Sequence, residues 1–313
     1  VKPSLQFIFV IKENTLNADI STWFYTGNFR NGSDGQITAK YDFLIDWGDG
    51  SQLEHYDNRM ANANNRLPVR HNYAKTGTYK VTLTGTCDNL FGYDGNVNAG
   101  AKQSAALVHS LWGVQVPKDS TSPLKYAYGS FFGCENLKFI GFGVFHNITE
   151  CKEVPHLYDG AVLARIEPWM LYGGHKLESI AYTFENCQMF TIDPDVFKNC
   201  TNVTNAEHCF HRCTSLIEIP TGLFDSMTKL TNVSVCFKSC TNIQTVPYTL
   251  FDKCHNITNF RECFCGGRYN GDGSYLPTMS ITSALPPMWN RNNVSNYTAY
   301  AHGCTKASNY NIA

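Results

Sequence analysis

Residues 206–240 read AEHCFHRCTSLIEIPTGLFDSMTKLTNVSVCFKSC, and the phrase Phe-x-x-Cys occurs twice in this stretch, at Phe210 and again at Phe237. The same apolar position recurs along the chain every 13 or 14 residues: Phe184, Phe197, Phe210, Phe224, Phe237, Phe251 and Phe264. The repeating unit is therefore about 27 residues long and consists of two similar halves. Self-similarity at this period predicts a solenoid in which each turn contains both halves.

The repeat extends toward the amino terminus in the same phase. Leu171, Tyr158, Phe145 and Phe131 occupy the expected positions, so the repeat spans at least residues 131–267. A second apolar position follows six residues after the first: Leu137, Leu177, Phe190, Val203, Leu216, Leu230, Ile243 and Ile257. Proline often comes shortly afterwards, where it ends a strand and opens a helical turn. We therefore expect short strands joined to helices of one or two turns.

The thirteen cysteines follow the repeat rather than a disulfide or zinc pattern. Stacked turns place equivalent residues about 5 Å apart, which predicts ladders of small buried thiols. Isolated disulfides are the main alternative. His208 and His211 beside Cys209 and Cys213 superficially resemble a zinc site, but this spacing recurs with the repeat, so no metal site is expected. Cys87 and Cys265 lie outside the pattern, whose members are Cys134, Cys151, Cys187, Cys200, Cys209, Cys213, Cys236, Cys240, Cys254, Cys263 and Cys304.

Length and charge narrow the class of protein. A chain of 313 residues is about two domains long. The net charge of −1 indicates no excess of basic residues, so nucleic acid is not an expected partner. No run approaches the ~18 apolar residues of a membrane-spanning helix, so no transmembrane segment is expected. The chain begins with Val1, which suggests that a targeting segment has been removed.

The first 116 residues show no trace of the repeat and are typical of β-structure. Aromatic and β-branched runs at 7–11, 41–47 and 78–84 are separated by Gly, Asn and Asp clusters, which predicts a β-sandwich. The phrase Trp47-Gly48-Asp49-Gly50-Ser51, followed by His71-x-Tyr73 and by a strand at 77–83, resembles the PKD domain, an immunoglobulin-like sandwich. We expect Asp46 and Asp49 to stabilise a turn rather than bind calcium, and His71 to hydrogen-bond within a loop.

The resemblance extends to nearly the whole chain. Residues 111–113 and 129–137 look like the junction in BspA-like surface proteins, and residues 287–290 and 303–310 look like the closing repeat of that group. The group is common in gut and oral anaerobic bacteria and carries leucine-rich repeats of the Phe-x-x-Cys-x-x-Leu type. The resemblance to this group implies a PKD-like sandwich at 1–116, an exposed loop at 117–123 and a solenoid at 124–313. Departures are Met227, Gly174 and Ala161 at the cysteine position, and an irregular insertion near 266–284.

No catalytic motif or phosphate-binding loop occurs in the sequence, so neither an enzyme nor a cofactor is expected. The resemblance implies an extracellular or cell-surface adhesion protein that binds a host or bacterial protein or a glycan. A carbohydrate-active accessory module or hydrolase is the first alternative, because PKD-like domains often accompany such enzymes. A structural spacer without a ligand is the second alternative.

Candidate binding residues are aromatic or charged side chains outside the repeat phase. Arg268, Tyr269 and Tyr275 lie in the insertion, and insertions into solenoids are often on the binding face. Trp169 and Tyr172 are further candidates because aromatic side chains give large contact areas at low entropic cost. A neutral Thr/Asn strip, which includes Thr204 and Asn205, is an additional possible surface, equally explained by solvation. Trp289 falls on the core position, which favours a packing role.

The thiol ladder predicts that the repeat cysteines are reduced and unreactive in the native protein. Titration with a thiol reagent should modify few cysteines before unfolding and nearly all of them in denaturant without reductant. Many reactive thiols in the native protein, or few after unfolding, would contradict the ladder.

Overall fold

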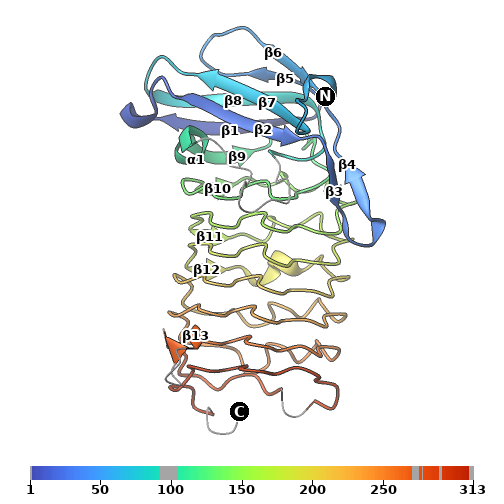
Figure 1. Cartoon of the computed structure of the whole chain (residues 1–313), viewed down its shortest axis with the longest axis vertical. Coiled ribbons are helices and arrows are strands. Elements are labelled where there is room, and N and C mark those ends of the chain that lie inside the picture. Colours follow the sequence, from blue (N-terminus) through green and yellow to red (C-terminus); the bar gives the residue numbers. More distant parts are fainter. Residues whose placement is uncertain (1, 92–104, 270–274, 277, 289–290, 310–313) are drawn as a thin grey trace.

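A computed structural model describes residues 2–91, 105–269, 275–276, 278–288 and 291–309. Two β-sheets form the amino-terminal end, and a column of stacked turns runs from them to the carboxyl end (Figure 1). The described residues contain a single α-helix, α1 (Ala105–Ser110). The described residues are thus mostly β-structure, which is consistent with the β-sandwich predicted for residues 1–116. None of the described helices has the length and apolar character needed to cross a membrane.

The larger sheet has six strands in the order β10-β9-β1-β8-β5-β6. Tyr41, Phe43 and Ile45 of β5 are buried while the residues between them are exposed, the alternation of a strand with one solvated face. The central strand β8 pairs antiparallel with β1 and β5. The bounds are β1 (Ser4–Ile11), β5 (Tyr41–Asp46), β6 (Glu54–Asp57), β8 (Gly77–Cys87), β9 (Leu111–Gln115) and β10 (Phe139–Ile140).

The second layer is the antiparallel pair of β2 (Asp19–Tyr25) and β7 (Arg66–Asn72). Phe24 of β2 packs on the larger sheet, with its ring 5.0 Å from that of Phe43 and 5.4 Å from that of Tyr41. Two sheets thus enclose one aromatic core, as a sandwich requires. Short 3-10 helices, η1 (Glu13–Thr15) and η3 (Asn58–Met60), lie between the strands.

The Gly-Asp-Gly phrase after β5 forms a tight turn. The Asp46 carboxylate accepts a hydrogen bond from the Gly48 amide at 2.9 Å, and the Asp49 carboxylate accepts one from the Ser51 amide at 3.0 Å. His71 Nε2 lies 2.8 Å from the second oxygen of Asp49. The carboxylates stabilise the turn, as predicted. His71 belongs to strand β7 (Arg66–Asn72) and bonds from there to the Asp49 turn, so its expected place within a loop is wrong.

Consecutive turns of the column pair in parallel at equivalent positions. The 26- or 27-residue steps agree with the repeat read from the sequence, and the step across residues 259–296 is longer because it contains the insertion. Two turns are also joined by β11 (Arg165–Ile166) and β12 (Thr191–Ile192). The bridges are Glu153–Ser179, Ser179–Asn205, Asn205–Asn232, Asn232–Asn259 and Asn259–Asn296, with Glu218–Thr245 on a second line.

Aromatic rings stack through the interior of the column. Neighbouring centroids are 5.2 to 5.8 Å apart with interplanar angles of 3 to 12°. Phe197, Phe224 and Phe251 form a second stack from the other half of each turn. The first turns of the column match the sequence repeat less well, but they belong to the same stack, because Tyr158 stacks between Phe131 and Phe184. The first stack comprises Phe131, Tyr158, Phe184, Phe210, Phe237 and Phe264.

The cysteines link successive turns. All thirteen are buried free thiols, as the ladder predicts. The thiol of Cys213 donates to the carbonyl of Phe184 at 3.0 Å, and that of Cys240 donates to the carbonyl of Phe210 at 2.9 Å. Where Met227 replaces the cysteine, the neighbouring Ser226 hydroxyl donates to the carbonyl of Phe197 at 2.6 Å. Each of these carbonyls already accepts an amide within its own turn, so the thiol or hydroxyl of the next turn adds a second donor.

The expected helices of one or two turns are wrong for most of the column. The described turns contain one short 3-10 helix, η4 (Pro194–Phe197), and are otherwise built from hydrogen-bonded tight turns. Alternate amides point along the column: the amide of Tyr182 donates to Glu207 and that of Phe184 to Cys209. Because these amides bond to the next turn, they cannot form the i→i−4 bonds of an α-helix.

One predicted core position is also wrong. Phe190 was assigned to the second apolar position, but 57% of its surface is exposed, and the adjacent Met189 is fully buried. The chain is shifted by one residue there, so Met189 fills the interior. Both residues are apolar, and hydrophobic pattern alone therefore did not distinguish them.

The sheets cap the column. The first strand of the column, β10, pairs in parallel with β9, so the six-stranded sheet continues into the turns. The predicted boundary near residue 116 stays a prediction, because this pairing joins the two sides of it. A hairpin of β3 (Asn28–Arg30) and β4 (Gln36–Thr38), with η2 (Gly32–Asp34) at its tip, descends beside the turns (Figure 1).

The hairpin is held against the column by polar contacts. Asn31 is buried and bonds twice to the column: its side-chain amide donates to the Glu150 carbonyl, and its side-chain oxygen accepts from the Lys152 amide. The Ser33 hydroxyl donates to Glu178 at 2.6 Å, and Arg30 pairs with Glu153 at 3.0 Å. These contacts fix the sheets relative to the first turns.

Residues with positive φ occur in pairs four positions apart in the tight turns, as at Tyr182 and Asn186 or His208 and Arg212, and several are not glycine. Arg212 is exposed and has a φ of +61°. This backbone conformation is unfavourable in free energy for any residue that carries a Cβ atom. We expect Arg212→Gly to raise the free energy of unfolding by about 0.5–1 kcal/mol after the entropic cost of glycine. Arg212→Ala keeps the Cβ and should give no such gain. Thermal denaturation compares the two, and equal melting temperatures would contradict the strain argument.

Candidate functional site

Two of the predicted binding residues belong to one exposed aromatic patch, which we define as Phe142, His146, Trp169 and Tyr172. Phe142 is 67% exposed and Tyr172 is 48% exposed. The His146 ring lies 4.5 Å from that of Phe142 and 4.4 Å from that of Tyr172, edge-on to both. Trp169 lies 6.3 Å from Phe142 and donates its indole N–H to the carbonyl of Ile140 at 2.8 Å. The patch thus has a fixed base and an open face.

The repeat brings these side chains together. His146 and Tyr172 each directly follow a core residue, Phe145 and Leu171, in consecutive turns. Equivalent positions in stacked turns are neighbours, so the two rings meet. Phe142 was missed by the sequence analysis, although its place between Gly141 and Gly143, outside the core phase, was a usable signal.

Two hollows flank Phe142. One has a volume of 190 Å³ and is lined by three residues of the patch together with polar groups of the next turn, including Asp195 and Asn199. The other has a volume of 310 Å³ and extends from His146 toward Ser120 and Ser122. An aromatic surface with polar groups at its edge is a common arrangement of small binding sites.

His146 is the polar member of the patch. Burial lowers the pKa of its imidazole, which favours the neutral ring. Its Nε2 atom is buried and makes no hydrogen bond to the described residues. Such atoms are rare in folded proteins and mark sites of interest.

A larger hollow, with a volume of 520 Å³, lies beside the six-stranded sheet. Several of its titratable groups are paired with one another: His55 Nε2 lies 2.8 Å from Asp42, and Lys125 lies 2.9 Å from Asp88. Exposed aromatic rings do not line it. We therefore regard the aromatic patch as the better candidate.

The insertion residues of the predicted site are only partly described. Arg268–Tyr269 and Tyr275–Leu276 form the antiparallel pair β13 and β14. The side chains of Arg268, Tyr269 and Tyr275 lie outside the described part of the structure, as does Trp289. The prediction of a binding surface at the insertion therefore stays a prediction.

The Thr/Asn strip has a structural role. The Asn205 side-chain oxygen accepts the amide of Glu207 at 3.0 Å, and Asn232 and Asn259 make the same bond in later turns. The Thr231 hydroxyl donates to the carbonyl of Thr204 at 2.9 Å. These groups stabilise the stacked turns, which makes the strip a weaker candidate for ligand binding.

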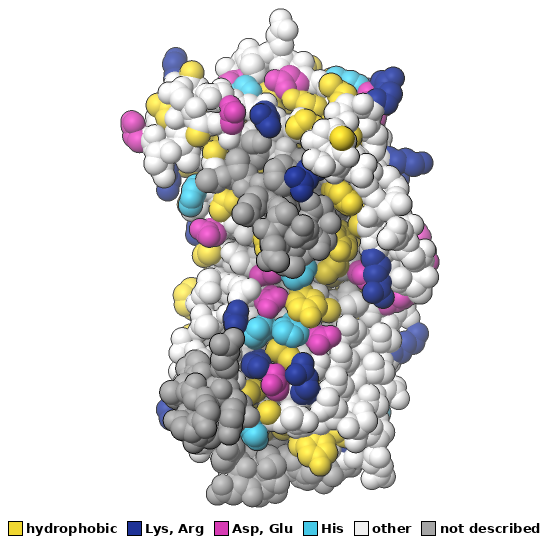
Figure 2. Space-filling model, viewed as in Figure 1, with side chains coloured by type: hydrophobic (Ala, Val, Ile, Leu, Met, Phe, Trp, Pro, Cys, Tyr) yellow, Lys and Arg dark blue, Asp and Glu magenta, His cyan; other side chains and the backbone are white. Residues whose placement is uncertain are grey.

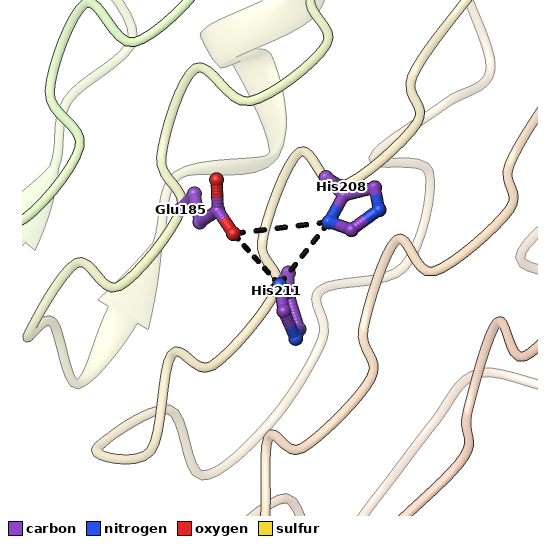
Figure 3. A group of neighbouring side chains, drawn as sticks. All are labelled: Glu185, His208 and His211. Carbon is purple, nitrogen blue, oxygen red and sulfur yellow. Dashed lines mark hydrogen bonds and ion pairs between the residues drawn. The ribbon is translucent and has the colours of Figure 1, made fainter. Parts of the chain in front are cut away.

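A second polar group, the histidine cluster, consists of Glu185, His208 and His211. Figure 3 shows the three side chains pointing toward one another from two neighbouring turns. The Oε1 atom of Glu185 lies 2.8 Å from His211 Nδ1 and 3.8 Å from His208 Nδ1. The two Nδ1 atoms are 3.1 Å apart. On the space-filling surface, histidines gather with acidic and basic side chains in the middle of this face (Figure 2).

His156 and Asp159 extend this group on the preceding turn. His156 Nδ1 lies 2.8 Å from Asp159 Oδ2, and Asp159 Oδ1 accepts a bond from Asn186 at 2.9 Å. In the described part of the chain, sets of three potential metal ligands occur here: Glu185 with His208 and His211, and Glu185 with His156 and Asp159. No cysteine belongs to either set, so the zinc pattern considered from the sequence, which combined Cys with His, is not formed.

The histidine cluster has marked electrostatics. Burial by itself would raise the pKa of Glu185, but hydrogen bonds from His208 and His211 outweigh it and lower the pKa to about 2. Burial lowers the pKa of His211 despite the attraction of Glu185. At neutral pH, the cluster therefore holds a carboxylate beside a neutral His211 imidazole.

Glu185 links stability to pH. Its folded pKa of about 2 is below the usual unfolded value near 4.3, so its stabilisation is present above about pH 4.3 and is lost as the pH falls toward 2. We expect Glu185→Gln to lower the melting temperature at pH 7, and the difference from the wild type to shrink between about pH 4.5 and pH 2. Glu218→Gln, at an exposed glutamate, should show neither effect. A pH-independent difference would contradict this assignment.

Comparison with known proteins leaves both sites unassigned. No protein-family model matches this chain, and no curated protein matches it either. The function is therefore argued from the geometry of the patch and of the column.

Proposed function

We propose that the chain is a non-catalytic binding module of an extracellular or cell-surface protein, which contacts a protein or glycan ligand through the aromatic patch. The observation that carries this proposal is the exposure of Phe142 and Tyr172 around a hollow with a fixed indole at its base. Exposed apolar patches of this kind mark interaction sites.

In this proposal, the column is a leucine-rich-repeat solenoid, and the two sheets are a PKD-like, immunoglobulin-like sandwich. Parallel pairing at 26- or 27-residue steps and the continuous ring stack support the solenoid. The Trp47 turn and the hydrogen bond from the Tyr73 hydroxyl to the Trp47 carbonyl at 2.9 Å support the sandwich class. Both features agree with a BspA-like protein, whose relatives are associated with adhesion.

The chemistry of the patch suits recognition. Aromatic faces bind the apolar faces of sugar rings as well as protein side chains, while Asp195 and Asn199 at the rim offer hydrogen-bonding partners. Tyrosine and tryptophan are typical of energetically dominant contacts because they bury large areas at low entropic cost. Solenoids bind along extended surfaces, and the patch joins at least two turns.

A hydrolase is the less favoured alternative. Glycosidases need two carboxyl groups, one of them with a raised pKa so that it can donate a proton. Asp159 and Glu185 have oxygens within 4.8 Å of each other. However, the lowered pKa of Glu185 keeps it ionised, and Asp159 is held by His156 and Asn186. Neither residue lines the hollows described above.

Binding to glycan and extracellular-matrix arrays tests the proposal. We expect the purified chain to bind members of at least one array, and Phe142→Ala and Tyr172→Ala each to weaken that binding about tenfold or more, as loss of a dominant contact does. Tyr248→Ala removes a tyrosine that is 49% exposed outside the patch and should leave affinity unchanged. Absence of any ligand would favour the structural spacer, and unchanged affinity in both patch variants would place the site elsewhere, with the insertion as the next candidate.

A further inference from the structure

We propose that Glu185, His208 and His211 form a binding site for a divalent transition-metal ion, with zinc as the expected occupant. The inference rests on the convergence of two imidazole nitrogens and one carboxylate oxygen on one point. It is independent of the proposed function, since the aromatic patch contains none of these residues.

The spacing of the three atoms fits a zinc ion. Their separations of 2.8, 3.1 and 3.8 Å define a triangle. A point equidistant from all three corners lies about 1.9 Å from each, and a small displacement out of their plane gives the 2.0–2.2 Å of zinc–nitrogen and zinc–oxygen bonds. The ligands therefore need no rearrangement larger than a few tenths of an ångström.

The fold holds these ligands in place. Glu185 comes from one turn and both histidines come from the next, and the amide of Asn186 donates to the His211 carbonyl between those turns. The ring of Tyr182 stacks between those of His156 and His208, at 5.1 and 4.7 Å. Ligands that are fixed before binding lose less entropy when the ion binds.

The close approach of the two imidazoles favours a bound cation. Without an ion, the two Nδ1 atoms 3.1 Å apart need a proton between them to avoid the repulsion of their lone pairs. A bound ion replaces that proton.

The donor set selects the class of ion. Two imidazoles and one carboxylate match the ligands of zinc sites that keep a fourth position open. Calcium and magnesium prefer sites made of oxygen ligands alone. The side chains of Glu185, His208 and His211 are 14, 21 and 10% exposed, so the cluster reaches the surface and a fourth ligand can approach from solvent.

The cysteines do not compete in the folded chain. The neighbouring Cys209 and Cys213 are fully buried. Burial raises the pKa of both thiols well above the usual value, which disfavours the thiolate that binds metals. Metal binding to the native protein should therefore report on the histidine cluster.

Calorimetric titration of the chelator-treated, tag-free chain with zinc chloride tests the site. We expect one ion per chain and a melting temperature that rises with zinc and returns after addition of chelator. Cobalt chloride should give the visible absorption of a tetrahedral nitrogen–oxygen site. Failure of the wild-type chain to bind zinc would overturn the proposal, as would thiolate-to-cobalt charge-transfer bands, which would place the ion on cysteines.

Variants locate the ion. His208→Ala and His211→Ala should each weaken zinc binding at least about tenfold, since even changes around a ligand have effects of this size. His175→Ala removes an exposed histidine outside the cluster and should bind zinc as the wild type does. If the His211→Ala variant does not fold, the His208→Ala variant provides the test, because His208 is the more exposed of the two. Unchanged zinc affinity in a folded His208→Ala variant would exclude the cluster as the site.

Discussion

The stacking of aromatic rings between successive turns is the interaction on which the rest of the column depends. Each phenyl ring of the first stack is fully buried and lies nearly parallel to the next at a little over 5 Å. This spacing is also that of backbone hydrogen bonding between neighbouring strands, so ring packing and amide bonding along the column are satisfied by the same rise. The parallel stack ends at Phe264, because the ring of Tyr300, which follows the insertion, lies edge-on to it at 81°.

A cysteine three residues after most of the stacked rings packs within the same geometry. The thiol is small enough to fit between stacked turns, and its weak S–H donor adds a second hydrogen bond to a carbonyl that already accepts a backbone amide. Ser226 beside Met227 shows that the hydrogen bond is retained even where the cysteine is lost. The high cysteine content is therefore explained by packing and by additional hydrogen bonds between turns.

Both candidate sites lie at positions that the core does not fix. The residue after each core position, as in His146 and Tyr172, and the residue two before it, as in Tyr182 and His208, point outward from successive turns. Stacked turns bring such positions to within about 5 Å of one another, so two substitutions one repeat apart suffice to build a contact. The aromatic patch and the histidine cluster both form from side chains at such equivalent positions, on different halves of the turn.

The sequence by itself determined the period, the phase and the buried ring and thiol positions, because a regular stack repeats its apolar residues at fixed intervals. It also determined the β character of residues 1–116 and the turn at Asp46–Ser51. Only the tertiary structure decided that tight turns replace the expected helices, that Met189 and not Phe190 is buried, and that β10 joins the column to the sheet. It alone brought Glu185 to His208 and His211, because contacts between residues on neighbouring turns depend on how the turns are stacked and on the direction of each side chain, which periodicity does not specify.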